Sequence, residues 1–165
     1  MHCVTPSQVV LQLATALMTL VVGCTSVPVT SPAPAMSGAC EVTPPNGSVP
    51  PGDPPNPLGY GNGQLWTELW PSGIVVFKVG GPGLVNADGS LAMKFPWVRG
   101  TNGPLQITGR RLDGSAPPLR SQVTDGYGDT GFQPATLIFP STGCWEVVGR
   151  AGTGSLTFIT TVVRY

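Results

Sequence analysis

At 165 residues, the chain has room for one domain of ordinary size, about 100–150 residues, with appendages. Eight basic and eight acidic side chains give a net charge of zero, which argues against a nucleic-acid partner, because phosphate binding requires a surplus of Lys and Arg. The 23 glycines and 19 prolines disfavour helices and are typical of short strands joined by tight turns.

Residues 9–22 form an apolar run of fourteen residues, shorter than the roughly 20 that span a bilayer, and we interpret residues 1–23 as a signal peptide. The run ends in Val21-Val22-Gly23-Cys24, which resembles the lipobox of bacterial lipoproteins. This resemblance implies an exported protein, cleaved before Cys24 and held in the cell membrane by a lipid on that cysteine, with its domain on the extracytoplasmic face. The alternative is a buried apolar segment of a cytosolic protein with a chance cysteine.

Residues 24–58 are predicted to form a lipid-anchored, Pro-rich stalk. Ten prolines stand among Ser, Thr, Gly and Ala in residues 25–58, and large apolar side chains are scarce. Such a segment buries too little surface to fold, so we expect a disordered, extended linker.

Residues 59–165 form the predicted domain. β-branched and aromatic residues between Gly, Pro and Asn punctuation predict seven strands, at 64–70, 74–79, 91–97, 105–111, 135–139, 144–150 and 156–164. Seven short strands with closely spaced turn signals indicate an all-β fold, a single Ig-like β-sandwich. Residues 113–131 lack any period and are predicted to be a long ordered loop, the part of a sandwich where function often lies.

The segment Gly143-Cys144-Trp145-Glu146-Val147 is similar to the start of the penultimate strand in Ig-like domains. Its period of two predicts that Trp145 and Val147 are buried while Cys144 faces away from the core. If the lipobox is processed, Cys3 is removed and Cys24 is acylated, which leaves Cys40 and Cys144. In an exported protein such a pair is expected to form a disulfide; the alternative is two free thiols.

The sequence predicts no catalytic site and no cofactor. Its single histidine, His2, lies in the predicted signal peptide, so Ser-His-Asp and Cys-His arrangements are excluded from the mature chain. The four cysteines form no CxxC pair, which disfavours a zinc site. Asp125 and Asp129 could offer two carboxylates to Ca²⁺, but the alternating ligands of an EF-hand are missing, and we predict no metal site.

Aromatic and loop residues are the remaining candidates for ligand binding. Trp66 and Trp70 share parity on one predicted strand, which favours the core, whereas Trp97 beside Arg99 is less constrained. We therefore expect Trp97 and Arg99, with Asp125, Tyr127 and Asp129 of the loop, to contact a ligand.

Together these features predict a non-enzymatic surface lipoprotein. Its β-sandwich would bind a protein or a cell-envelope glycan, and its lipid anchor would bind the membrane. The alternative is a secreted domain resembling a protease inhibitor or enzyme accessory, acting through residues 113–131.

Overall fold

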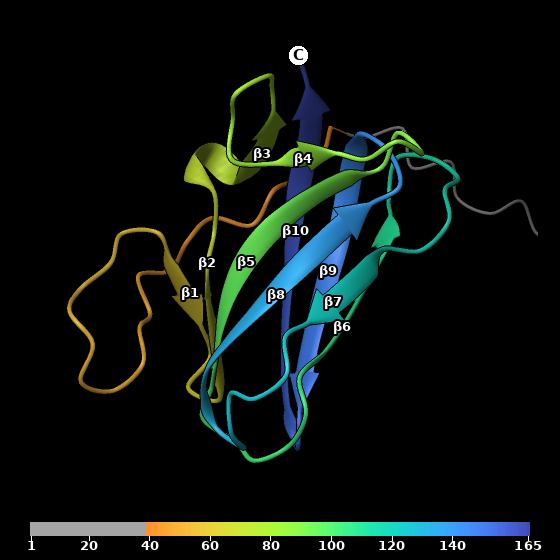
Figure 1. The fold of residues 1–165 in the computed structure, drawn as a ribbon. Coiled ribbons are helices and arrows are strands. Elements are labelled where there is room, and N and C mark those ends of the chain that lie inside the picture. The colour runs from red at the N-terminus through yellow and green to blue at the C-terminus, as the bar shows by residue number, and fades with distance from the viewer. Residues whose placement is uncertain (1–38) are drawn as a thin grey trace, which may run out of the picture. The chain divides into compact units, whose positions relative to one another are not determined.

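The structure, a computed structural model, describes residues 39–165, and within them the chain forms ten strands and one 3-10 turn (Figure 1). The elements are β1 Gly59–Gly61, β2 Leu65–Glu68, η1 Pro71–Gly73, β3 Ile74–Phe77, β4 Leu84–Val85, β5 Leu91–Arg99, β6 Gln106–Arg111, β7 Arg120–Val123, β8 Gly131–Phe139, β9 Gly143–Ala151 and β10 Gly154–Arg164. The predicted all-β class is confirmed.

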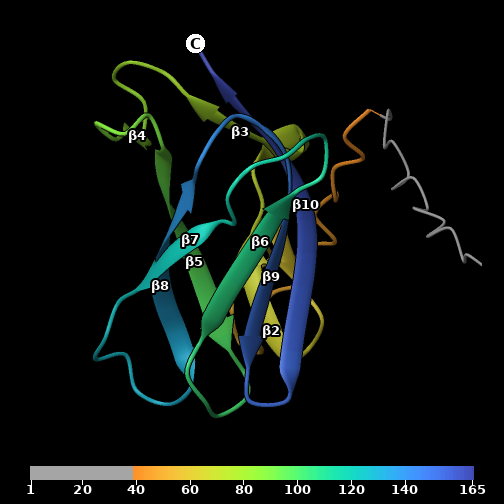
Figure 2. The same ribbon diagram turned by 90° about the vertical axis from the view of Figure 1, so that its right-hand side faces the viewer.

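Two sheets make up the domain. Sheet A has six strands in the order β1-β2-β5-β8-β7, with β4 also paired to β5, and sheet B has four in the order β3-β10-β9-β6. Figure 2 shows them as two layers, with β5, β7 and β8 in one and β6, β9 and β10 in the other. Every strand pair is antiparallel except β3 with β10, which is parallel. The predicted β-sandwich is therefore confirmed.

The core lies between the two sheets and is built from alternating positions of the long strands. Trp145 and Val147 of β9 are fully buried, as their parity predicts. The ring of Phe158 on β10 lies 5.6 Å from Phe95 and 6.2 Å from Trp97, measured between centroids. A Cβ atom at Gly149 would overlap the indole ring of Trp97, so only glycine lets β9 pass this close to the aromatic cluster.

All seven predicted strands are present with shifted ends, and three more accompany them. β1 and β4 are only three and two residues long, too short for an alternation of apolar and polar residues to predict them. β7 lies inside the predicted loop of residues 113–131. Its sequence Arg-Ser-Gln-Val has no apolar alternation, and it exists because Ser121 and Gln122 pair with Leu137 and Thr136 of β8.

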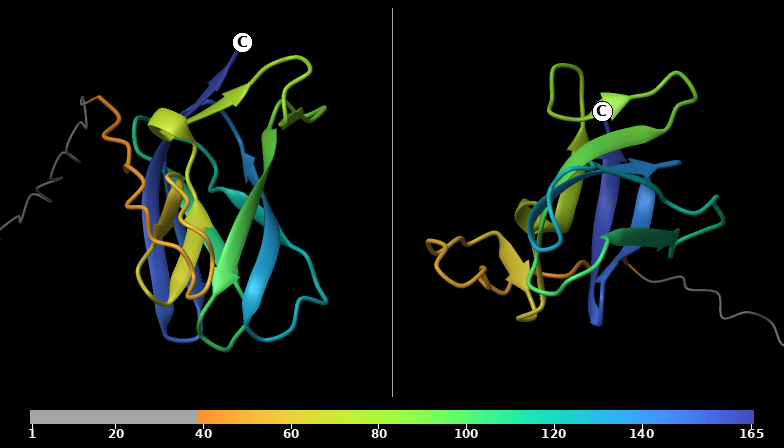
Figure 3. Two further views of the ribbon diagram at one scale, coloured as in Figure 1. Left: turned by 90° about the vertical axis from the view of Figure 1, so that its left-hand side faces the viewer. Right: turned by 60° about the horizontal axis from the view of Figure 1, so that its bottom comes forward.

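Residues 39–58, called the arm below, differ from the disordered linker that the sequence predicts. The backbone N–H of Thr43 donates to Ile159 of β10 at 3.0 Å, and the N–H of Ile159 donates to the Thr43 hydroxyl at 2.9 Å. The Asn46 amide donates to the carbonyl of Gly61 at 2.8 Å. These polar residues between the prolines supply the hydrogen bonds that dock the arm alongside β10 (Figure 3, left).

A disulfide joins Cys40 of the arm to Cys144 of β9, with the two Cα atoms 5.5 Å apart across a sequence separation of 104. Cys144 lies on the face of β9 opposite to Trp145 and is buried, and this face is where Cys40 attaches. The predicted pairing is confirmed within the described residues, whereas Cys3 lies outside them.

Candidate functional site

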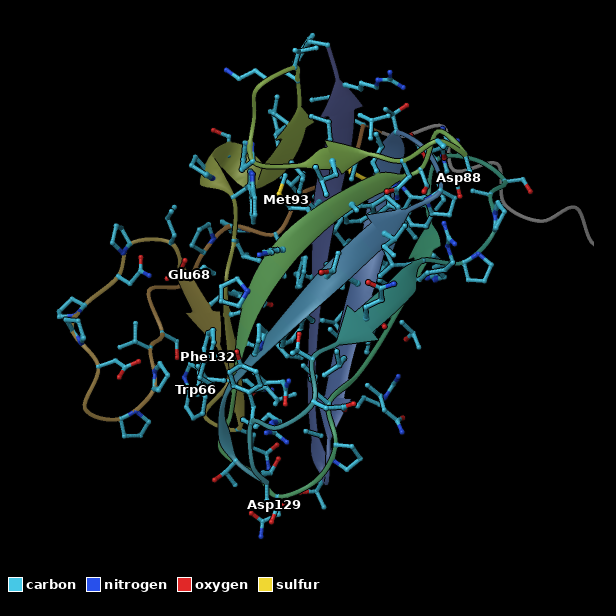
Figure 4. All side chains as sticks on the ribbon, viewed as in Figure 1. Trp66, Glu68, Asp88, Met93, Asp129 and Phe132 are labelled. Carbon is cyan, nitrogen blue, oxygen red and sulfur yellow. A yellow bond between two sulfur atoms is a disulfide. The ribbon has the colours of Figure 1, made fainter. Side chains whose placement is uncertain are left out.

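A groove of about 360 Å³, called the arm groove below, lies between the arm and the outer face of sheet A. Its floor comes from three neighbouring strands. Trp66 of β2 lies opposite Val98 of β5, and Val98 lies opposite Phe132 of β8, so their side chains form one row across the sheet. Figure 4 shows Trp66 and Phe132 next to each other at this edge.

The row is apolar although it lies on the outside of the sandwich. The Phe132 side chain is 51% exposed, whereas Trp66 is only 6% exposed because the arm covers it. The Trp66 indole N–H donates to the hydroxyl of Ser48 at 3.2 Å. An exposed phenylalanine beside a covered tryptophan and Pro96 gives the groove a flat apolar floor, the kind of surface on which sugar rings and peptide side chains pack.

The opposite wall is the arm itself, with Pro50, Pro54 and Pro55 facing the groove. Asn56 shapes this turn, because its side-chain oxygen accepts from the N–H of Leu58 at 2.9 Å. The Asn56 amide also donates to Glu68 of β2 at 2.6 Å, which ties the wall to the sheet. Prolines have little backbone freedom left to lose, so this wall is formed before any ligand arrives.

The polar groups of the arm groove are acidic or neutral. Asp53 and Glu68 contribute carboxylates, Ser48 and Thr67 contribute hydroxyls, and no Lys or Arg lines the groove. The arrangement can therefore hold a ligand by stacking and by hydrogen bonds or ion pairs to carboxylate oxygens.

A second cavity, of about 320 Å³, lies at the end of the sandwich between the β5–β6 and β7–β8 connections and is called the end pocket below. Arg99 is 3% exposed there. Its guanidinium donates to the carbonyl of Gly103 at 2.8 Å, to that of Gly128 at 2.8 Å and to that of Tyr127 at 3.3 Å. These bonds hold the loop that follows β7 in place.

The structure divides the five predicted ligand-binding residues into two groups. Trp97 is fully buried in the core and offers no surface, which corrects its prediction as a ligand contact: residue 97 has the inward parity of β5. Arg99 is also inward and buried, and its donors are largely taken by backbone carbonyls. Asp125, Tyr127 and Asp129 do come together, because all three line the end pocket.

The prediction that Trp66 and Trp70 share a core face is wrong for Trp66. β2 ends at Glu68, so the strand period does not continue to residue 70. Leu65 takes the core position, Trp66 lies under the arm, and Trp70 stacks on Phe95 at 4.9 Å.

Phe132 is the functional candidate that the sequence missed. It falls between the predicted loop and the predicted strand 135–139, and only the extension of β8 back to Gly131 places it on the outer face. The inward positions Ala135, Leu137 and Phe139 of β8 are apolar, but the inward Gln133 is polar, so apolar alternation does not mark the first residues of this strand.

None of the described ionisable groups with a shifted pKa lines either cavity. The Arg111 guanidinium hydrogen-bonds to Asp113 at 2.6 Å and lowers the pKa of that carboxyl. Hydrogen bonds from Ser90, followed by Arg120, lower the pKa of Asp88. These pairs sit on the surface and fasten loops to strands. Among residues 39–165, no three His, Cys, Asp or Glu side chains converge as a metal site would require.

Comparison with known proteins gives no match to a family model, to a curated protein or to a solved structure. Within the described part of the chain, no helix is long and apolar enough to cross a membrane. The predicted lipidation residue, Cys24, lies outside the described residues.

Proposed function

We propose that this protein is a non-enzymatic surface lipoprotein whose β-sandwich binds a protein or a cell-envelope glycan in the arm groove. The observation that carries the proposal is the groove itself, with the exposed ring of Phe132 on its floor, a proline wall opposite, and carboxylates within reach. Concave apolar surfaces with a few polar groups are the usual form of a binding site.

The membrane anchor is part of the same proposal. Its support is the lipobox-like Val21-Val22-Gly23-Cys24 and the disulfide between Cys40 and Cys144. Disulfides persist in oxidising compartments, which agrees with an exported domain on the extracytoplasmic face. Intact mass and detergent partitioning of the native protein and of Cys24→Ala test this part, since a lipid on Cys24 predicts a heavier, detergent-soluble native form.

The Ig-like version of the sandwich is also a proposal. It is supported by two packed sheets of mainly antiparallel strands and by a buried tryptophan, Trp97, between them. The disulfide differs from the one that links the two sheets of antibody domains, because here it fastens the arm to sheet B.

Binding to isolated cell envelopes tests the groove. We expect Phe132→Ser to reduce binding of the detergent-extracted protein at least tenfold, because the substitution removes the exposed ring from the floor. Tyr165→Ser is the matched control, since Tyr165 is an exposed aromatic residue that lines neither cavity. Equal binding by the native protein and Phe132→Ser would contradict the assignment of the groove.

A second candidate function is that of a protease inhibitor or an enzyme accessory domain that acts through residues 113–131. The observation in its favour is that Arg99 holds the carbonyls of Tyr127 and Gly128, which presents the half-exposed Tyr127 ring on a fixed backbone. Tyr127→Ala should abolish inhibition of a target protease while the fold survives. Unchanged inhibition would remove this candidate.

A further inference from the structure

The charged side chains of this domain are distributed unevenly over its surface. All eight carboxylate residues lie among the described residues, and three form ion pairs: Asp88 with Arg120, Asp113 with Arg111, and Glu146 with Arg110. Eight minus three leaves five carboxylates outside ion pairs: Glu41, Asp53, Glu68, Asp125 and Asp129. Four of these five line the arm groove or the end pocket.

Basic side chains are missing from the same surface. Arg99 is the single cation lining either cavity, and it is buried, with Nη1 and Nη2 donating to backbone carbonyls and Nε left without a partner. Lys94 shares the outer face of β5 with Pro96 but lines neither cavity. The exposed charges that line both cavities are therefore all negative, in a chain whose total charge is zero.

The two cavities meet through one aromatic pair. Phe132 lines the arm groove and Tyr127 lines the end pocket, and their rings pack edge to face with centroids 5.8 Å apart. In Figure 4, Glu68 lies above the neighbouring Phe132 and Trp66 on this side of the domain, and Asp129 lies below them. Carboxylates thus lie at both ends of a continuous apolar row.

The row has the length of a short extended peptide. Neighbouring strands are about 4.8 Å apart, so Trp66 and Phe132, separated by two strand spacings, lie about 10 Å apart. The Tyr127 ring extends the row by 5.8 Å. An extended chain advances about 3.3 Å per residue, so a segment of roughly five residues has the length of the row. At the Trp66 end such a segment would contact the arm, which covers the indole, and toward the other end it would contact the exposed rings of Phe132 and Tyr127.

We propose that the arm groove and the end pocket form one docking surface for an extended, cationic segment of a partner polypeptide. Lys or Arg side chains of the partner pair with the carboxylates at the two ends, and their stems and charged heads pack on Phe132 and Tyr127, whose ring faces attract cations. This inference rests on the proposed function and names the partner of the same groove. A neutral glycan would use the four carboxylates only as hydrogen-bond acceptors and would leave their charge unpaired, and an anionic polymer would be repelled by them.

The test measures binding of three probes to the detergent-extracted native protein in a non-ionic detergent. The probes are a fluorescein-labelled ten-residue peptide of alternating lysine and proline, the corresponding glutamate–proline peptide, and chitohexaose. We expect the lysine–proline peptide alone to bind, with affinity falling as salt is raised from about 0.05 M to 0.5 M, because screening weakens exposed ion pairs.

Substitutions that each neutralise one carboxylate then show which residues contact the peptide. Glu68→Gln and Asp129→Asn should each weaken binding of the lysine–proline peptide about two- to five-fold, the range for exposed ion pairs. Phe132→Ser should weaken it at least tenfold. Glu41→Gln is the matched control: it removes the one unpaired carboxylate that lines neither cavity, and it should leave binding unchanged. Thermal midpoints within about 2 °C of the native protein show that each variant is folded.

The outcomes separate this inference from the proposed function. Equal binding of both peptides, or an equal loss with Glu41→Gln, would overturn the cationic partner. Binding of chitohexaose that is lost in Phe132→Ser, with no binding of the lysine–proline peptide, would keep the groove as a site and overturn the inference. If none of the three probes binds and Phe132→Ser binds envelopes as well as the native protein does, both the cationic partner and the arm groove as a binding site are wrong.

Discussion

The disulfide between Cys40 and Cys144 provides the sharpest test of how this domain is stabilised. We consider the double substitution Cys40→Ala and Cys144→Ala, which removes the bond without leaving a free thiol at either end. The arm keeps its hydrogen bonds from Thr43 to Ile159 and from Asn46 to Gly61, so the native state should remain assembled.

The size of the effect follows from the loop that the bond closes. For a sequence separation of 104, the chain-entropy relation gives an entropy loss in the unfolded chain of about 16 cal/mol/K, or about 4.7 kcal/mol at 25 °C. Domains of this kind have free energies of unfolding of about 5–15 kcal/mol, so the bond contributes a large share. With a urea dependence of about 1.5 kcal/mol/M, the unfolding midpoint should fall by about 3 M.

The assay is urea unfolding followed by tryptophan fluorescence, with three samples: the oxidised native protein, the same protein reduced, and the double variant. Reduction alone should account for most of the shift, because it breaks the bond while both sulfur atoms stay in place. The further difference between reduced protein and double variant measures the packing of the two sulfurs. A shift below about 0.7 M, equivalent to about 1 kcal/mol, would refute the loop-closure account.

Three other perturbations test the core, the loop and the surface charges. Gly149→Ala would drive a methyl group into the indole of Trp97, and we expect a loss of about 1–3 kcal/mol in thermal unfolding; a native-like midpoint would show that β9 can move away. Arg99→Met leaves the loop carbonyls without their donor, so amide exchange in the loop after β7 should accelerate at least tenfold; unchanged exchange would mean that the loop is held by other contacts. Arg111 lowers the pKa of Asp113 below its ordinary 3.8, so this carboxylate stabilises the fold fully above about pH 4 and less as the pH falls through the lowered value. Asp113→Asn should therefore flatten the loss of stability as the pH falls below the ordinary 3.8, measured by urea midpoints, and an unaltered acid limb would contradict the shift.

Strand positions were predictable where the side-chain pattern is local. The run from Cys144 to Arg150 alternates buried and less buried residues, and this period placed Trp145 and Val147 in the core. β7 had no such pattern, because its stability comes from pairing with β8 rather than from its own side chains. The sequence of residues 113–131 alone therefore did not predict this strand.

The candidate site was much less predictable, because its parts come from distant segments. Trp66, Val98 and Phe132 face one another only through the register of β2, β5 and β8. The covering wall belongs to the arm, whose prolines suggested a disordered stalk. Composition reports how much surface a segment can bury, but it does not reveal that Thr43 and Asn46 find hydrogen-bond partners about 116 and 15 residues away.

By itself, then, the sequence determined the fold class, the main strands, the core face of the last sheet and the pairing of Cys40 with Cys144. The fold class, the strands and the core face depend on turn residues and on a period of two. The cysteine pairing was inferred from the lipobox-like segment, which indicates export to an oxidising compartment. All of these are patterns within short stretches of sequence. The tertiary structure alone decided that the arm docks and that Phe132 lies in an acidic groove. Those outcomes depend on strand register and on contacts between segments far apart in the chain, which no local pattern encodes.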